Sequence, residues 1–278
     1  MSLAGRRIAI TGAGRGIGLA IARAASGGGA HVALGDLDEE TAGAAAGSLP
    51  NAHAFALDVR DRDSFSAFLD GATDAMGGLD VLVNNAGIML IGPFATQSIE
   101  DVERMLDINV VGVANGVQLA IPIFERGGRG HIVNIASSAG RVAVRGGAAY
   151  SASKFAVRAL SAALREELRG TGIELSAVLP GIVKTELADG IKEVRGAKSA
   201  TPEDVAAAVV RVIERPRPET TVPRELTAVM WLLDTLPARL RVRALRAMGA
   251  HDSFWESDDA ARAAYEARAR GFDPALRG

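Results

Sequence analysis

Residues 7–18 read Arg7-Ile8-Ala9-Ile10-Thr11-Gly12-Ala13-Gly14-Arg15-Gly16-Ile17-Gly18. The first five have the composition of a short strand, and a glycine-rich loop and a helical pattern follow them. Glycines let a backbone turn tightly and approach a pyrophosphate, which then lies at the N-terminus of the helix. A glycine-rich loop alone is a weak signal, but here it stands between a strand and a helix, as a dinucleotide-binding motif requires. The stretch therefore predicts a β-α unit that binds a dinucleotide.

The next expected strand, residues 31–35, ends at Asp36. A carboxylate at this point accepts hydrogen bonds from the ribose hydroxyls of an adenosine and repels a 2′-phosphate. The alternative is that Asp36 is the N-cap of a helix that starts near Glu39.

Strands and helices continue to alternate along the chain. We expect a strand over 52–57, a helix over 62–76 and a strand over 79–83. Asp58 and Val59 follow the first of these strands, and Asn84-Asn85-Ala86-Gly87 begins where the last one ends. This alternation predicts an α/β fold with a Rossmann-type, doubly wound parallel sheet. Ligands of such sheets bind beyond the carboxyl ends of the strands, where these polar clusters fall.

Tyr150 and Lys154 lie four residues apart in an Ala- and Leu-rich helical segment, so both side chains face one side of the helix. A tyrosine has an ordinary pKa of about 10, and a neighbouring ammonium lowers it toward neutrality. An ordinary surface helix with these residues is the alternative.

The strand over 130–135 leads into Ser137 and Ser138, and one of these hydroxyls is expected near Tyr150. Asn109, inside the helical pattern 98–125, is either a satisfied buried amide or a functional group.

Together these motifs resemble the short-chain dehydrogenase/reductase family, in its classical branch, over roughly residues 5–222. The resemblance implies a seven-stranded parallel sheet with helices on both faces and a chemistry of hydride transfer. It implies that Tyr150 is the general acid/base and that Ser137, thirteen residues earlier, orients the substrate oxygen. Lys154 would hold the nicotinamide ribose and lower the pKa of the tyrosine, and Asn109 would anchor a water in a proton relay.

The resemblance also implies a cofactor site. Gly12, Gly16 and Gly18 would hold the pyrophosphate, and Asp36 marks NAD, although Arg15 is a position where relatives that prefer NADP carry a basic residue. We expect NAD, with NADP as the alternative, and no metal. The implied cofactor-binding residues are Gly12, Arg15, Gly16, Ile17, Gly18, Asp36, Asp58, Val59, Asn85, Ala86, Gly87, Tyr150, Lys154, Pro180, Gly181, Val183 and Thr185.

The chain continues past the family's usual end. We expect a catalytic domain over residues 1–222 and a helical C-terminal extension over 223–278, packed on the same or a neighbouring subunit. In the extension Leu226, Val229, Met230 and Leu233 form an apolar stripe at i, i+3, i+4 and i+7. Several arginines follow, so an interfacial membrane helix is an alternative, which we do not favour. Residues 186–200 are expected to form a mobile loop over the substrate, and 258–270 a solvated helix.

Composition narrows the class of protein. Apolar residues make up 48% of the 278 residues and charged residues 23%, as in soluble globular proteins. With a net charge of −2 the chain has no overall positive field that would attract nucleic acid. The lack of cysteine excludes disulfides and thiolate chemistry. The N-terminus runs directly into a strand and no apolar run reaches about 20 residues, so we expect neither a signal peptide nor a membrane span. The expectation is a cytoplasmic homodimer or homotetramer.

We therefore predict an NAD-dependent enzyme that interconverts a secondary or lipophilic alcohol and its carbonyl. The alternatives are an NADP-dependent carbonyl reductase and a catalytically silent dinucleotide-binding sensor. The complete set Asn109, Ser137, Tyr150 and Lys154 favours an enzyme, because a silent protein has no physical need of it.

Overall fold

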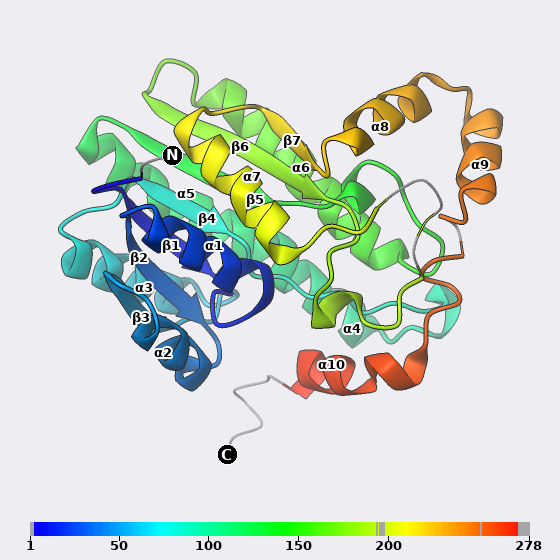
Figure 1. The fold of residues 1–278 in the computed structure, drawn as a ribbon, viewed down its shortest axis with the longest axis horizontal. Coiled ribbons are helices and arrows are strands. Elements are labelled where there is room, and N and C mark those ends of the chain that lie inside the picture. The colour runs from blue at the N-terminus through cyan, green and yellow to red at the C-terminus, as the bar shows by residue number, and fades with distance from the viewer. Residues whose placement is uncertain (1–2, 193, 195–197, 251, 272–278) are drawn as a thin grey trace.

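In the computed structural model the chain forms one parallel sheet with helices on both faces (Figure 1). The structure describes residues 3–192, 194, 198–250 and 252–271. The strands are β1 (Arg7–Thr11), β2 (His31–Asp36), β3 (Ala52–Ala56), β4 (Val81–Asn84), β5 (Gly130–Ile135), β6 (Ile173–Pro180) and β7 (Glu219–Val222). Their order is β3-β2-β1-β4-β5-β6-β7, and every neighbouring pair is parallel. The predicted seven-stranded, doubly wound sheet is confirmed. Its winding reverses between β1 and β4, which is where such sheets bind ligands.

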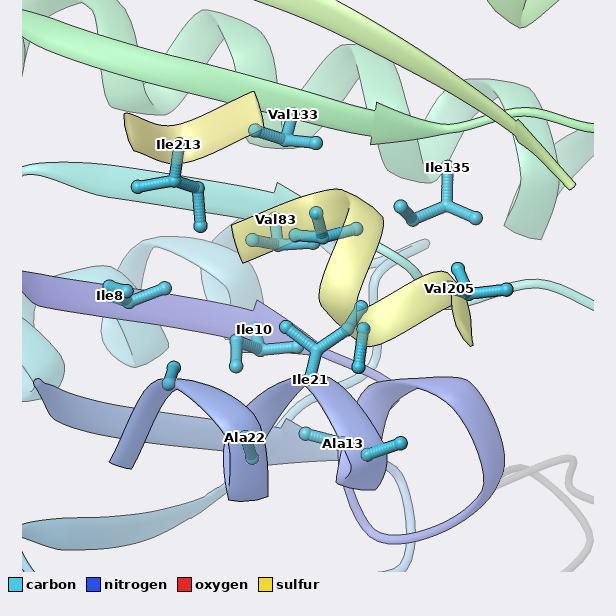
Figure 2. Packing of buried hydrophobic residues seen from close by; sticks show 14 of the residues in the cluster. Ile8, Ile10, Ala13, Ile21, Ala22, Val83, Val133, Ile135, Val205 and Ile213 are labelled. Atoms are coloured by element: carbon cyan, nitrogen blue, oxygen red, sulfur yellow. The ribbon is translucent and has the colours of Figure 1, made fainter. Parts of the chain in front are cut away.

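Two layers of helices cover the sheet. One face carries α1 (Gly16–Gly27), α2 (Glu39–Gly47) and α7 (Pro202–Glu214), and the other carries α3 (Arg62–Met76), α5 (Gly112–Gly127) and α6 (Ala148–Glu167). Residues of β1 alternate between the faces: Ile8 and Ile10 pack with α1 and α7, whereas Ala9 belongs to the opposite cluster (Figure 2). Both faces of the sheet are therefore buried, and the carboxyl ends of its strands are left for a ligand.

The predicted helix over 98–125 is present, but its middle is irregular. It consists of α4 (Ile99–Leu106), a π-helical turn over Asp107–Val111, and α5. π-Helical turns occur often at functional sites, and this one contains Asn109. By length and composition the helix Ile99–Gly127 is apolar enough to cross a membrane, with 39% of its most apolar window buried. Here α5 covers the sheet through Val113, Val117 and Phe124.

The extension forms α8 (Glu225–Thr235), α9 (Ala238–Ala247) and α10 (Asp259–Gly271). In Figure 1, α8 and α9 project at one end of the sheet, and α10 returns beside α4. Arg270 of α10 pairs with Asp101 of α4 at 2.9 Å. The helix predicted over 258–270 is present and most of its residues are exposed, but one side of it is not solvated, because Arg262 is only 1% exposed and Ala269 is also buried.

The expected loop over 186–200 contains a short 3-10 turn, Glu186–Ala188, and Val183 bridges to Ala200 at its base. Residues 193 and 195–197 of this loop lie outside the described residues.

Candidate active site

The glycine-rich loop after β1 touches the loop after β4. Gly12 has φ +62°, and a Cβ there would lie 2.9 Å from the Cα of Ala86. Asn85 ties the two loops together, because its Nδ2 donates to the carbonyl oxygens of Thr11 at 2.9 Å and Gly12 at 3.0 Å. Any side chain at Gly12 would separate these loops, so glycine is required for the close approach.

Gly18 was expected to hold the pyrophosphate with Gly12 and Gly16, but the structure places it elsewhere. It lies within α1, and a Cβ there would meet the carbonyl oxygen of Gly12 at 2.1 Å. The structure therefore does not bring Gly18 to the wall of the cavity described below. Glycine at this position lets α1 pack against the loop, whereas Gly12 and Gly16 do line the cavity.

Asp36 lies at the end of β2, facing the glycine-rich loop. Its carboxylate accepts a hydrogen bond from the amide of Gly14 at 2.8 Å and one from the amide of Asp38 at 3.2 Å. The N-cap of α2 is Asp38, which accepts from the amide of Thr41, so the N-cap alternative for Asp36 is wrong. Asp38 also binds the guanidinium of Arg15 at 2.7 Å, which holds that side chain against the start of α2.

Asp58 and Val59, after β3, form the neighbouring part of the wall. Burial alone would raise the pKa of Asp58, but hydrogen bonds from Arg60 and its positive charge outweigh burial and the pKa is lowered. The carboxylate is therefore charged at neutral pH and held at 2.7 Å from the Arg60 guanidinium.

Tyr150 lies in the first turn of α6, and it is buried together with Lys154 and Ser137. Burial raises the pKa of Tyr150, and a hydrogen bond with the Ser137 hydroxyl opposes that shift. The Nζ of Lys154 lies 5.9 Å from the centre of the tyrosine ring and donates to the carbonyl oxygen of Ile135 at 3.2 Å. Burial lowers the pKa of Lys154 to about 8.

The direction of the tyrosine shift differs from the one expected from the Tyr150–Lys154 spacing. In the protein alone, removal of the phenol from water outweighs the other influences, so its pKa moves up. At neutral pH the phenol is protonated, and Lys154 keeps its charge below about pH 8.

Asn109 lies behind the cavity wall. Its Oδ1 accepts from the amide of Ile88 at 2.9 Å, and its Nδ2 donates to the Ile88 carbonyl at 2.9 Å and to the Ser153 hydroxyl at 3.0 Å. Ser153 in turn donates to the carbonyl of Tyr150 at 2.7 Å. A Cβ on Gly87 would lie 3.1 Å from the Oδ1 of Asn109 and 3.4 Å from the Nζ of Lys154. Asn109 therefore fixes the loop after β4 against the first turn of α6.

A cavity of about 590 Å³ joins these residues and extends beneath the C-terminal helices. Asn109 and Gly18 are absent from its wall, and every other predicted site residue lies in it. Those residues are Gly12, Arg15, Gly16, Ile17, Asp36, Asp58, Val59, Asn85, Ala86, Gly87, Ser137, Tyr150, Lys154, Pro180, Gly181, Val183 and Thr185. Ser138 also lines the cavity, but Ser137 is the serine that opposes the rise in the pKa of Tyr150.

The far part of the cavity is mainly apolar and is built largely by the extension, with Ser253 and Arg268 as its polar members. The predicted stripe of α8 faces it, and later residues add to the wall. The ring of Phe254 lies 6.3 Å from that of Tyr150. Tyr265 and Ala269 of α10 complete the wall, and the sequence interpretation missed them. The sequence did hold a signal for them. Arg262, Tyr265 and Ala269 are spaced so that they share one face of a helix, and Tyr265 is one of only two tyrosines in the chain.

The residues of the near part of the cavity fit a dinucleotide. Gly12 and Gly16, both at positive φ, present backbone without side chains at the start of α1, and Asp36 lies one strand away. When bound there, a nicotinamide dinucleotide supplies the hydride chemistry. A buried Tyr–Lys pair with a serine beside it, at this edge of the sheet, defines a dinucleotide-linked oxidoreductase.

Residues 6–196 match the family model described as short chain dehydrogenase. The chain belongs to the short-chain dehydrogenase/reductase family. It is 39% identical over 195 residues to the 3-alpha-(or 20-beta)-hydroxysteroid dehydrogenase of Mycobacterium tuberculosis, which covers 69% of this chain and 74% of that protein. It is 37% identical over 227 residues to the glycine betaine reductase ATRR of Emericella nidulans, covering 77% of this chain but only 18% of that longer protein.

Two solved structures share the fold. A short chain dehydrogenase/reductase from Burkholderia phymatum in complex with NAD has a TM-score of 0.76 and 27% identity, covering 84% of this chain and 94% of that one. A 3-ketoacyl-(acyl-carrier-protein) reductase from Brucella melitensis complexed with NADH has a TM-score of 0.74 and 28% identity, covering 80% and 99%.

Proposed function

We propose that this protein is an NAD-dependent oxidoreductase that interconverts a lipophilic secondary alcohol and its carbonyl. The observation that carries the proposal is the position of Tyr150. Its side chain lines one cavity together with Ser137 and with Lys154, which lies one helical turn away, and the far part of that cavity is mainly apolar. The mainly apolar wall favours a substrate with a large apolar skeleton.

In carbonyl reduction Tyr150 donates its proton to the substrate oxygen, and Ser137 orients that oxygen by a second hydrogen bond. The raised pKa of Tyr150 suits this direction, because the phenol carries its proton at neutral pH. In alcohol oxidation the phenolate must accept the hydroxyl proton, so this rate should increase with pH. The ammonium of Lys154 favours the phenolate and is retained below about pH 8.

The preference for NAD rests on two side chains. The carboxylate of Asp36 stands where a 2′-phosphate would meet direct repulsion. The guanidinium of Arg15 is already paired with Asp38 and hydrogen-bonded to Thr41, so it offers less to that phosphate than an exposed arginine would. The relatives solved with NAD or NADH agree with this choice.

The test is a screen of alcohols and ketones of increasing carbon number with NAD(H) and NADP(H), following the absorbance of the reduced cofactor. We expect turnover with NAD(H), with kcat/KM increasing with substrate apolar surface. Asp36→Ala should narrow the gap between the cofactors. Equal or better kcat/KM with NADP(H) in the unmodified protein would contradict the preference, and no turnover with either cofactor would favour a silent dinucleotide-binding protein.

We also propose a homo-oligomer. The helices expected to form its symmetric interface, α4–α5 and α6, expose the apolar side chains of Ile99, Val111 and Phe155. Light scattering at micromolar concentration should give a dimer or tetramer, and a fully active monomer would contradict the proposal.

A further inference from the structure

The last helix, α10, is joined to the substrate cavity by a buried arginine. Arg262 is 1% exposed and donates to the carbonyl oxygens of Met89 at 2.9 Å, Leu187 at 3.1 Å and Asp189 at 3.1 Å. Met89 belongs to the loop after β4, and the other two to the loop after β6. One guanidinium therefore connects α10 to both loops that border the substrate part of the cavity. Glu266 pairs with it at 3.0 Å, so its charge is compensated.

Tyr265 lies next to this arginine in the cavity wall. The guanidinium carbon of Arg262 is 5.4 Å from the centre of the Tyr265 ring, a cation–π distance. The phenol oxygen accepts a hydrogen bond from the amide of Met89 at 2.8 Å. The backbone of Met89 is thus bound at both ends by α10, through Tyr265 at its N–H and Arg262 at its C=O. These contacts fix the phenol oxygen relative to the loop that also carries Asn85 and Gly87.

The hydroxyl proton of Tyr265 is still available. The hydroxyl oxygen accepts a hydrogen bond from the Met89 amide. Among the residues that the structure describes, no group accepts a hydrogen bond from the hydroxyl itself. Burial raises the pKa of Tyr265, so the phenol stays protonated at neutral pH. Tyr150 and Tyr265 belong to the same apolar cluster, which places both side chains at one part of the cavity. The apolar side chains of Met89, Leu187 and Phe254 line the same cavity, and Glu186, Ser253 and Arg268 are among its polar lining residues. Tyr265 is half-buried in this wall, and a hydroxyl that a ligand cuts off from water is costly to leave unpaired.

We propose that Tyr265 is a specificity-determining residue that donates its hydroxyl proton to a second oxygen of the substrate, remote from the carbon that reacts at Tyr150. Arg262 is then a positioning residue that holds Tyr265 and the two loops. The substrate class becomes a lipophilic alcohol or ketone that carries one additional hydrogen-bond acceptor. This inference rests on the proposed function of the same cavity and adds the second point of recognition.

The experiment compares pairs of ketones that differ in one atom. Each pair has a methoxy or an ethyl group at the far end of one carbon skeleton: 4-substituted cyclohexanone, 6-substituted 2-decalone and 7-substituted perhydrophenanthren-2-one. The methoxy oxygen accepts a hydrogen bond but is not reduced, and the two groups have nearly the same shape. In the unmodified protein, the methoxy member of the skeleton that spans the two tyrosines should have a kcat/KM about fivefold to tenfold higher than the ethyl member.

Tyr265→Phe should abolish this preference by lowering kcat/KM for the methoxy ketone alone, within the same range of about fivefold to tenfold. The ethyl ketone reports any general damage from the lost bond to Met89. Trp255→Phe is the matched control, because Trp255 is an exposed aromatic of the extension outside the cavity wall, and it should keep the preference. Arg262→Met should raise KM for both ketones together and speed hydrogen exchange at the Met89 amide.

The inference is overturned if no skeleton shows a methoxy preference, if the preference survives in Tyr265→Phe, or if that variant slows both ketones equally. Unchanged KM values in Arg262→Met would overturn the positioning role. If the enzyme reduces the ethyl ketones but shows no higher kcat/KM for the methoxy ketones, the role of Tyr265 is contradicted and the proposed function is not. Failure to reduce any ketone with either cofactor would remove both.

Discussion

Gly12→Ala gives the sharpest prediction about the cofactor site. Gly12 has φ +62°, where an alanine costs about 1–2 kcal/mol of conformational energy. Its new Cβ would also lie 2.9 Å from the Cα of Ala86, closer than such carbons approach, so one of the two loops must move by about half an ångström. Overpacking of this kind adds about 1–3 kcal/mol. The bonds from Asn85 to Thr11 and Gly12 oppose the movement.

Gly5→Ala is the matched control. Gly5 has φ +73°, but a Cβ there meets nothing within 4 Å, so this variant carries the conformational cost alone. A loss of about 1 kcal/mol shifts Tm by about 2–4 °C in a chain of this size. Gly5→Ala should show that shift and keep the dissociation constant for NAD. Gly12→Ala should lose more stability and bind NAD at least about tenfold more weakly, because the displaced loop no longer presents its amides to the pyrophosphate.

The assay combines thermal unfolding with calorimetric titration of NAD. Ligand stabilisation follows the ratio of NAD concentration to its dissociation constant, so the increase in Tm with added NAD should be reduced in Gly12→Ala only. Normal NAD affinity in a folded Gly12→Ala would refute the claim that contact between the two loops builds the cofactor site. Equal weakening in Gly5→Ala would show that the effect is general destabilisation.

Two other perturbations test separate parts of the structure. Ser137→Ala should slow hydride transfer by about 10²-fold or more, since it removes the hydroxyl that opposes the rise in the pKa of Tyr150 and would orient the substrate oxygen. Ser138→Ala should slow the same step by less than about threefold. The reverse order in single-turnover rates would contradict the assignment. Burial lowers the pKa of His131 to about 4, so the unfolded chain binds the proton more readily between about pH 6.5 and 4, and stability should decrease by about 3 kcal/mol as pH falls through that window. His131→Gln should flatten this part of the denaturant-midpoint profile, and an unchanged slope would exclude His131 as its source.

The fold was predictable because its signals are local. Each strand is a short apolar run that ends in a polar cluster, and the glycine-rich loop between β1 and α1 sets the class of sheet. The same logic placed Asp36 and the pair Ser137 and Ser138, since the carboxyl ends of parallel strands meet at one edge. Tyr150 was identified from its spacing to Lys154, and the choice of Ser137 over Ser138 came from the family resemblance. Asn109 was identified, but only the structure gives its contacts, with the loop after β4 and with Ser153.

The remaining features depend on contacts distant in sequence. Gly18 belongs to the glycine motif, yet the orientation of α1 turns it toward the carbonyl of Gly12 rather than the cavity. Helix α10 has the Ala/Arg composition of a solvated helix, and most of its residues are exposed, but one side is held against the domain because Arg262 binds backbone carbonyls more than 70 residues away in sequence. The pKa of Tyr150 depends on how far the side chain is buried beside Phe254 and its neighbours. The spacing of Tyr150 and Lys154 in the sequence does not reveal that burial.

The most direct test of the account is hydride transfer in Tyr150→Phe, measured in single turnover with a ketone that the unmodified enzyme reduces. The substitution removes only the ionisable oxygen, so the rate should fall by about 10²–10⁴-fold. The dissociation constant for NADH should change by less than about twofold, since the ring still fills its place beside Lys154 and Phe254. A Phe variant that keeps more than about a tenth of the unmodified rate would contradict the assignment of Tyr150 as the general acid/base.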